Sequence, residues 1–216
     1  MNPPASRTDS TGHPDRAWTG LVLAAGASSR MGRPKQSLQW NGTTLVDHTI
    51  QTVRTAGASE VLVVEQSSTP RPGAISVANP RWADGMGRSL EVGLRAALDG
   101  KLCPAREVCL VHLCDLPRVR PRSLASLVAA VSAENPVAVA EFDQTFGPPV
   151  ALHAGVIAAV IEMLVADASR GGKAVLRSLG VRLTRVPIEE AAHDLDTPAD
   201  YANATQRLAV DDDHLP

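Results

Sequence analysis

Aromatic side chains are scarce in this 216-residue chain, which has three Trp, two Phe and one Tyr, or 3% of its residues. So few rings leave little material for a surface on which nucleic-acid bases could stack. The formal net charge at pH 7 is only -2, so no overall field attracts a polyanion such as DNA. Any recognition of phosphate must be local, and we expect no nucleic-acid partner.

Cysteines and long apolar runs are scarce as well. Cys103, Cys109 and Cys114 form no C-x-x-C pair, which argues against a disulfide framework and against a zinc knuckle. No run approaches the ~20 apolar residues that span a bilayer, and residues 1–16 lack the apolar centre of a secretory signal. We therefore expect a cytoplasmic protein with no membrane partner.

The chain is expected to form a single domain, because this length can bury one sufficient core. Residues 17–210 would form it, with 1–16 as a disordered leader and 211–216 as an acidic tail. Strands are expected at 20–25, 60–65, 74–78, 107–114, 137–142 and 182–188, and the clearest helices at 43–56, 88–99, 121–133 and 154–166. This alternation predicts a three-layer α/β/α fold with a mostly parallel, Rossmann-like sheet, whose ligands bind beyond the carboxyl ends of the strands.

The segment that follows the first expected strand is rich in small residues and cations. Residues 23–35 read LAAGASSRMGRPK, with two glycines that allow tight turns and bring backbone N–H groups near an anion. Arg30, Arg33 and Lys35 can neutralise several phosphate charges. Neither G-x-x-x-x-G-K-[ST] nor G-x-G-x-x-G occurs here, which disfavours a P-loop NTPase and a nicotinamide dehydrogenase. The segment is interpreted as a triphosphate loop, the alternative being an ordinary βα turn.

This loop resembles the signature L-A-A-G-x-S-x-R-M-G-x-x-K of the MobA-like nucleotidyltransferases. Its Leu-Ala-Ala-Gly start most resembles the molybdenum cofactor cytidylyltransferase branch, since the guanylyltransferase branch more often has glycine where Ala25 stands. In that family the loop wraps the triphosphate, and the sheet is of the nucleotidyltransferase type. The resemblance implies that the nucleotide is bound by Leu23, Ala24, Ala25, Gly26, Arg30, Gly32 and Lys35.

A carboxylate ends the apolar strand expected at 107–114. Asp115 would lie at the binding edge, where a hard cation such as Mg²⁺ is held by one or two carboxylates and the substrate's phosphates. The alternative is an N-cap for the helix that begins near Pro121. The sequence CDLP around Asp115 also resembles the C/G-D-x-P motif that carries the family's metal-binding aspartate.

Two more segments carry the resemblance. Residues 194–201, DLDTPADY, are similar to the family's D-I-D-T-P-E-D-Y element, which implies that Asp196 is a second Mg²⁺ ligand. From the sequence alone, Asp196 equally indicates a helix start with proline in its first turn. Residues 83–90, ADGMGRSL, resemble the G-M-G-x-S-L element that contacts the nucleotide. The implied contacts are Gly85, Gly87 and Ser89, and an ordinary N-cap is the alternative for Ser89.

Two segments differ from the motifs that the family has on the side of the acceptor substrate. Residues 146–150, FGPPV, resemble G-H-P-V, but Pro148 replaces the histidine. Residues 169–174, SRGGKA, resemble a G-D-x-G-A stretch but lack its aspartate. The donor side is therefore intact in this sequence, while the identity of the acceptor stays open.

The resemblance covers about residues 19–206 and implies a Mg²⁺-dependent nucleotidyltransferase. It would transfer CMP from CTP to the phosphate of a molybdopterin-type cofactor and release pyrophosphate, with Arg30, Lys35 and Asp115 as its catalytic residues. A molybdenum hydroxylase is a candidate recipient of the product. The alternatives are guanylyl transfer, transfer to a sugar or alcohol phosphate, a non-catalytic carrier of molybdenum cofactor, and a nicotinamide oxidoreductase.

Overall fold

The computed structural model describes residues 16–100, 106–167 and 171–212, with side chains of the last helix described as far as Gln206. The predictions for Cys103, for residues 1–15 and for 213–216 lie outside this part of the chain, as do the first two residues of the 169–174 segment.

Two structural features lie near the ends of the domain expected at residues 17–210. The guanidinium of Arg16 donates to the backbone oxygen of Val131 at 2.9 Å and pairs with Glu107 at 3.0 Å, so this residue contacts the domain. At the other end, helix α6 (Pro198–Asp212) includes the first two residues of the expected acidic tail. The domain bounds of 17 and 210 stay a prediction.

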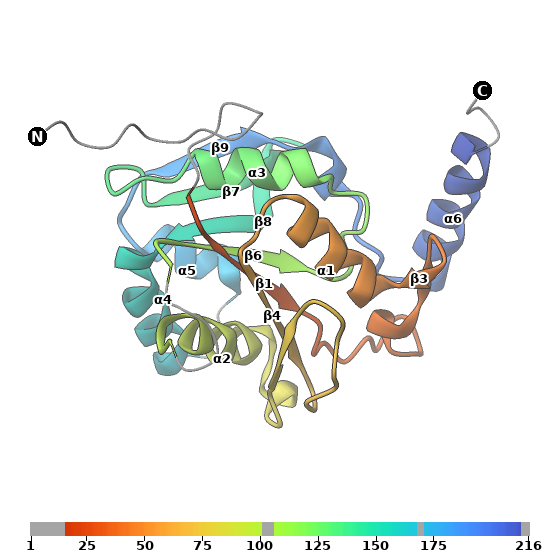
Figure 1. Ribbon diagram of the computed structural model, residues 1–216, viewed down its shortest axis with the longest axis horizontal. Helices are drawn as coiled ribbons and strands as arrows, with labels where there is room; N and C mark the ends of the chain where they lie inside the picture. Colours follow the sequence, from red (N-terminus) through yellow and green to blue (C-terminus); the bar gives the residue numbers. More distant parts are fainter. Residues whose placement is uncertain (1–15, 101–105, 168–170, 213–216) are drawn as a thin grey trace, which may run out of the picture.

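A seven-stranded sheet forms the middle layer of the protein (Figure 1). Its strands are β1 Thr19–Leu23, β4 Glu60–Glu65, β5 Ile75–Ala78, β6 Val108–Leu113, β7 Val137–Phe142, β8 Thr145–His153 and β9 Leu183–Pro187. They lie in the order β5-β4-β1-β6-β8-β7-β9, and β8 runs antiparallel to both of its neighbours. The predicted mostly parallel sheet is confirmed. Strand β8 was missed because Gly147, Pro148 and Pro149 interrupt its apolar pattern.

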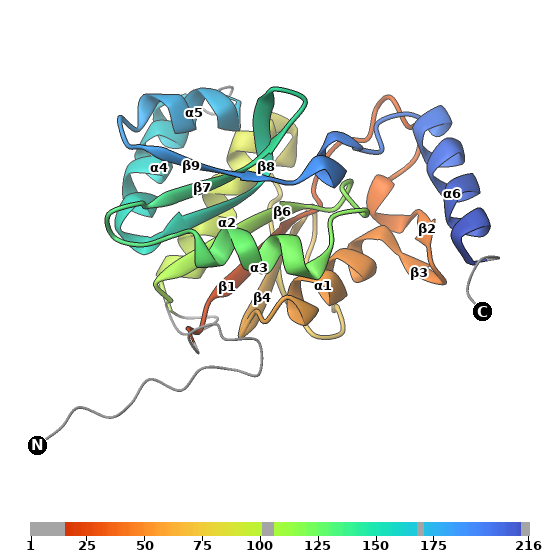
Figure 2. The ribbon, with the colours of Figure 1, turned by 90° about the horizontal axis from the view of Figure 1, so that it is seen from above.

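Helices cover both faces of the sheet (Figures 1 and 2). Helices α1 (Leu45–Thr55) and α3 (Pro121–Ala129) bury their apolar sides against one face. The other face is covered by α2 (Met86–Leu98), α4 (Ala154–Ala166) and α5 (Gly172–Ser178). The predicted three-layer architecture is confirmed. None of the described helices is long and apolar enough to cross a membrane.

A smaller unit lies at one end of the sheet, where Figure 2 shows α6 beside a short hairpin. The hairpin consists of β2 (Gln39–Trp40) and β3 (Thr43–Thr44), and it shares a third apolar cluster with α6. Three short 3₁₀ helices complete the structure: η1 Lys35–Ser37, η2 Trp82–Asp84 and η3 Glu189–Ala192. The hairpin strands are two residues long, too short for the period of a strand to be visible in the sequence.

Helix α2 lies unusually close to the sheet because a glycine faces the strands. A Cβ at Gly93 would lie 2.5 Å from Leu21 Cδ1 and 2.9 Å from Val64 Cγ2, so any larger residue would push the helix away. This close approach packs α2 against β1 and β4. The helix begins two residues earlier than the sequence pattern indicated.

His112, on β6, is a deeply buried ionisable residue with 1% of its surface exposed. Its Nδ1 has no hydrogen-bond partner within the described residues. Burial, followed by the nearby charge of His48, lowers the pKa of His112 to about 3. The folded protein therefore holds this ring neutral, as expected for a core histidine.

Acid should destabilise the fold through His112, because the unfolded chain protonates the ring near pH ~6.5 and the folded chain does not. This contribution to stability is complete above that pH and declines as the pH falls toward the lowered pKa. We expect the free energy of unfolding to fall by about 2 kcal/mol between pH ~7.5 and ~5, and His112→Leu to lose much less. Urea unfolding measures both, with His193→Gln as a control at an exposed histidine. An equal loss in wild type and His112→Leu would contradict the assignment.

Candidate active site

A cavity of about 550 Å³ opens beyond the carboxyl ends of β1 and β6, at the edge where parallel sheets bind their ligands. Its volume is typical of sites for small molecules and cofactors. The loop after β1, the segment from η2 into α2, the end of β6 and one aspartate before α6 enclose it. The lining residues are Leu23, Ala25, Gly26, Ala27, Ser28, Ser29, Arg30, Lys35, Gln36, Trp82, Ala83, Gly85, Met86, Ser89, Leu113, Cys114, Asp115 and Asp196.

The loop after β1 turns tightly around Ser28, whose φ of 53° is left-handed. Ser28 accepts the backbone N–H of Gly32 on its carbonyl and that of Lys35 on its Oγ, at 3.2 and 2.9 Å. The N–H groups of Gly26 and Ala27 have no hydrogen-bond partner in the described part of the chain. A Cβ on Gly26 would meet nothing within 4 Å, and both residues line the cavity, so an anion has room beside these donors.

Lys35 joins two carboxylates that are far apart in the sequence. Its Nζ lies 3.1 Å from Asp115 Oδ2 and 2.5 Å from Asp196 Oδ1. Burial by itself lowers the pKa of Lys35, but the hydrogen bonds and charges of Asp196 and Asp115 outweigh burial and raise it. The ammonium group is therefore firmly cationic at the centre of the cavity.

Hydrogen bonds on both sides of Asp196 in the sequence position its side chain next to Lys35. The backbone N–H of Leu195 donates to the carbonyl of Asp115 at 2.9 Å, which ties the segment before α6 to the end of β6. On the other side Thr197 and Asp200 form a reciprocal cap: Asp200 Oδ2 accepts the Thr197 N–H at 2.7 Å, and Thr197 Oγ1 accepts the Asp200 N–H at 3.2 Å. The predicted helix start is confirmed, and it aims Asp196 at Lys35. Arg30 pairs with the other Asp196 oxygen at 2.5 Å.

The carboxylates of Asp115 and Asp196 fit a divalent cation. Asp115 Oδ1 is buried and accepts no hydrogen bond from the described residues, so one hard oxygen ligand is left free. A lysine ammonium already lies between the two carboxylates, which demonstrates that the site attracts positive charge. Burial, and then the charges of Asp196 and Asp115, raise the pKa of the neighbouring Asp194. Two carboxylates without a full protein cage suit Mg²⁺, which takes further ligands from phosphates and water.

The start of α2 forms the opposite wall. Gly85, with φ 114°, is the N-cap, and Met86 extends into solvent at the rim with 62% of its surface exposed. Ser89 is not a cap: it is the fourth residue of α2, and its Oγ accepts a hydrogen bond from Asn79 Nδ2 at 3.0 Å. The capping alternative for Ser89 is therefore wrong, and this buried pair fixes the wall of the cavity.

Most residues expected from the sequence lie together in this cavity. The lining includes nine of them: Leu23, Ala25, Gly26, Arg30, Lys35, Gly85, Ser89, Asp115 and Asp196. Ala24, Gly32 and Gly87 are not part of the lining. Ala24 points into the core with 1% exposure, and Gly87 is buried within α2. Arg33, expected near phosphate, instead lies 5.6 Å above the ring of Tyr201.

Sequence reasoning missed part of the apolar wall, above all Trp82 and Met86. The only signal was their position: Met86 lies within the segment 83–90 selected from the sequence, and Trp82 lies just before it. Cys114 also lines the cavity, but burial and then the charge of Asp115 raise the pKa of its thiol far above the ordinary range. Cys114 therefore acts as a small apolar residue.

Asp115 is not the cap of the following helix, which was the alternative role. The N-cap of α3 is Arg120.

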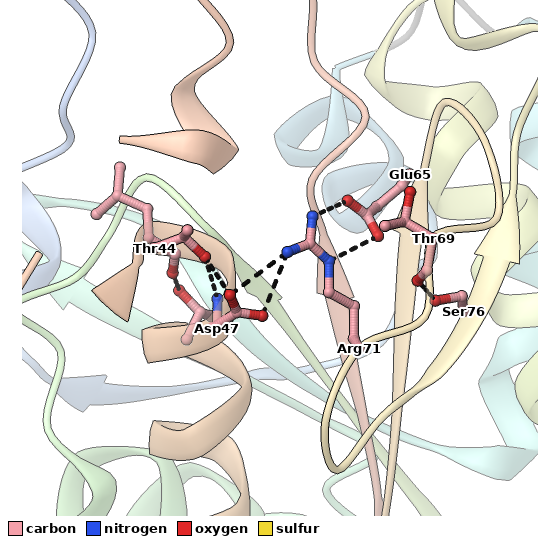
Figure 3. A network of polar contacts seen from close by, with 8 residues as sticks. Thr44, Asp47, Glu65, Thr69, Arg71 and Ser76 are labelled. Carbon is pink, nitrogen blue, oxygen red and sulfur yellow. Dashed lines mark hydrogen bonds and ion pairs between the residues drawn. The ribbon is translucent and has the colours of Figure 1, made fainter. Parts of the chain in front are cut away.

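A buried ion network supports the cavity from the side of β4 (Figure 3). Glu65 ends this strand with 5% of its surface exposed, and its carboxylate accepts two hydrogen bonds from Arg71, at 2.7 and 3.1 Å. Arg71 also contacts Asp47 at 3.3 Å, in the first turn of α1. Next to Glu65, Gln66 donates to the carbonyl of Ala25 at 3.5 Å. The network thus joins α1, β4 and the loop after β1.

Comparisons with known proteins identify the family of this chain. Residues 20–185 match the family model of the MobA-like NTP transferase domain. Over 48 residues the chain is 50% identical to a molybdenum cofactor guanylyltransferase of Xanthomonas euvesicatoria pv. vesicatoria, a match to 22% of this chain and 25% of that protein. The chain thus spans about a quarter of the length of the curated guanylyltransferases it matches.

Two other relatives cover nearly the whole domain. One is the nicotine blue oxidoreductase of Paenarthrobacter nicotinovorans, 29% identical over 196 residues, which are 83% of this chain and 92% of that protein. The other is the structure of a nucleotidyl transferase from Methanothermobacter thermautotroptrophicus, with a TM-score of 0.70 and 22% identity over 88% of this chain and 97% of that chain. The latter likeness establishes the fold. Since the family model covers well over half of the sequence, this chain belongs to the MobA-like NTP transferase domain family.

Proposed function

We propose that this protein is a Mg²⁺-dependent nucleotidyltransferase that moves CMP from CTP to the phosphate of a molybdopterin-type cofactor and releases pyrophosphate. The observation that carries the proposal is the meeting of three features in one cavity. These are a loop with free backbone N–H groups, the cations Arg30 and Lys35, and the carboxylates Asp115 and Asp196. A triphosphate needs the first two, and its metal ion needs the third.

The chain's own residues would supply binding and charge neutralisation. The N–H groups of the loop after β1 would donate to the triphosphate oxygens, and Arg30 and Lys35 would exchange their carboxylate partners for phosphate oxygens. No protein nucleophile is needed, because a terminal phosphate with a second pKa near ~6 is already largely dianionic at neutral pH. The acceptor oxygen would attack the α-phosphorus in line with the departing pyrophosphate.

Asp115 and Asp196 would hold the metal ion, which when bound neutralises charge on the reacting phosphates. For this, Lys35 must move away from the two carboxylates toward the substrate. The free Oδ1 of Asp115 offers a ligand even before that exchange. A molybdenum hydroxylase is the proposed recipient of the product.

Cytosine is the proposed base because of Ala25, which lines the cavity with 2% of its surface exposed. The guanylyltransferase branch more often has glycine there, and the methyl group of an alanine narrows this wall. The curated relatives with the highest identity over short matches are guanylyltransferases, so guanylyl transfer is the direct rival.

The proposal is tested by pyrophosphate release from CTP and from GTP, each with Mg²⁺ and molybdenum-loaded molybdopterin. We expect release with CTP to exceed that with GTP by at least about tenfold, equivalent to ~1.4 kcal/mol of discrimination. Faster release with GTP would support the same mechanism but show that guanine, and not cytosine, is the base of the transferred nucleotide. Release only after molybdopterin is replaced by a sugar phosphate would overturn the acceptor. Tight molybdopterin binding without any release would favour a carrier.

A second function, reduction or oxidation of an organic substrate, is favoured by the 29% identity to nicotine blue oxidoreductase over nearly the full domain. The described loop after β1 has no G-x-G-x-x-G, which disfavours a dinucleotide in this position. Binding of NADH or NADPH, followed by fluorescence, separates the two functions. Micromolar binding that CTP does not displace would support the oxidoreductase.

A further inference from the structure

Three cations surround one buried aromatic ring outside the cavity. The ring of Phe146, 4% exposed, has Arg185 Cζ at 5.2 Å, Arg177 Cζ at 5.4 Å and Lys173 Nζ at 6.0 Å from its centre. The ring lies on β8, Lys173 and Arg177 lie on α5 and Arg185 lies on β9, so the fold and not local sequence gathers them. We name Phe146, Lys173, Arg177 and Arg185 the Phe146 cluster.

The Phe146 cluster carries more positive than negative charge. Glu141 pairs with Arg185 at 2.9 Å, while Lys173 donates to the neutral hydroxyl of Thr145 at 3.2 Å. Across the described residues, neither Lys173 nor Arg177 has a carboxylate partner. A ring face stabilises a nearby cation only modestly, by ~1 kcal/mol at exposed sites. Three cations with one carboxylate beside them give this cluster a net positive charge, which can attract an anion.

The position of the cluster relates it to the candidate active site. Strands β6 and β8 pair antiparallel, and the last pair of their ladder is Val111 with Val150. Because β8 begins at the edge where the antiparallel strand β6 ends, Phe146 near the start of β8 lies toward the edge at which Asp115 follows β6. The cluster therefore lies at the same edge of the sheet as the proposed metal ligands, on the strand next to β6.

One glycine leaves room for the lysine. A Cβ at Gly147 would lie 3.6 Å from Lys173 Cε and 3.3 Å from Phe142 Cζ, so a larger side chain would crowd both. The aliphatic part of Lys173 passes over Gly147, and its ammonium group reaches Thr145 at the end of the β7–β8 hairpin. The ammonium group is thus aimed at the edge of the sheet.

We propose that Lys173, Arg177 and Arg185 bind a phosphate group of the acceptor, and so act as the subsite that orients the second substrate. This rests on the proposed nucleotidyl transfer to a phosphorylated acceptor. The cavity beyond β1 takes the nucleotide, and the Phe146 cluster takes the acceptor from the side of β8. The subsite replaces contacts that Pro148, which has no side-chain donor, does not offer.

Steady-state kinetics with CTP and molybdopterin test the subsite in Arg177→Gln and Arg185→Gln. Each should raise the KM for molybdopterin roughly tenfold, the effect of losing one charge-assisted hydrogen bond. The KM for CTP and kcat should stay within about twofold, because neither arginine lines the nucleotide cavity. Arg182→Gln is the matched control and should change nothing, because this exposed arginine neither lines the nucleotide cavity nor lies against Phe146.

A titration with inorganic phosphate tests the same subsite without turnover. In the wild type, backbone amide resonances of residues 145–147 should shift with added phosphate, and Arg177→Gln should abolish these shifts while Arg182→Gln keeps them. Shifts that persist in Arg177→Gln, or a lowered melting temperature with an unchanged molybdopterin KM, would overturn the subsite in favour of a purely structural cluster. If no acceptor supports transfer, the proposed function fails, and the phosphate titration still decides the subsite.

Discussion

Asp115→Ala should reduce nucleotidyl transfer by about a thousandfold or more, the range seen when one group that stabilises transition-state charge is removed. Asp115 is the one carboxylate of the cavity with a buried oxygen that accepts no hydrogen bond from the described residues. Its removal takes away a proposed metal ligand and leaves Lys35 paired with Asp196 alone. Pyrophosphate release at saturating Mg²⁺ measures the loss.

The control for this variant lies on the same strand. Glu107, just before the opposite end of β6, is an exposed carboxylate that pairs with Arg16, so Glu107→Gln changes a charge far from the cavity. It should keep activity near the wild-type level. Urea unfolding should place Asp115→Ala within ~1 kcal/mol of the wild type, because Lys35 keeps its ion pair with Asp196 and no buried charge is left without a partner. Full metal-dependent turnover by Asp115→Ala would refute its assignment as a metal ligand.

The sequence predicted the parts of the fold in which apolar residues form continuous runs or recur at helical spacing. Strands β1, β4 and β6 are continuous apolar runs, as expected of strands buried on both faces, and α1 to α4 have apolar sides at helical spacing. Strand β8 and helix α5 escaped prediction for a physical reason. Gly147 to Pro149 break the strand pattern, and Gly171 and Gly172 precede a helix of only seven residues. In both cases the surrounding sheet and helices override weak local preferences.

The candidate site was predictable where one segment carries several of its residues. The loop from Leu23 to Lys35 is such a segment, because glycines and cations alternate within it. The bridge from Lys35 to Asp115 and Asp196 was not, since it depends on a backbone contact between Leu195 and Asp115 that no local pattern encodes. The Phe146 cluster was missed for the same reason, as its charged members come from two separate elements.

The largest effect on stability is expected at Arg71, in the network of Figure 3. Arg71→Met would leave the Glu65 carboxylate, 5% exposed, without the two hydrogen bonds that compensate its burial. A buried charge that loses its partner costs about 3–5 kcal/mol, far more than an exposed ion pair contributes. We therefore expect the free energy of unfolding of Arg71→Met to fall by about 3 kcal/mol or more in urea at neutral pH.

Changing both partners separates the effect of an unpaired buried charge from the effect of lost packing. Glu65→Met/Arg71→Met removes the carboxylate together with the guanidinium, so no uncompensated charge remains, and most of the stability should return. Glu65→Gln keeps an acceptor for Arg71, which also retains Asp47 at 3.3 Å, and should cost less than Arg71→Met. Equal destabilisation of the double and single variants would mean that shape, and not charge, stabilises this corner. If charge dominates, Arg71→Met should also loosen the loop after β1, because Gln66 beside Glu65 donates to Ala25, and nucleotide binding should weaken along with the fold.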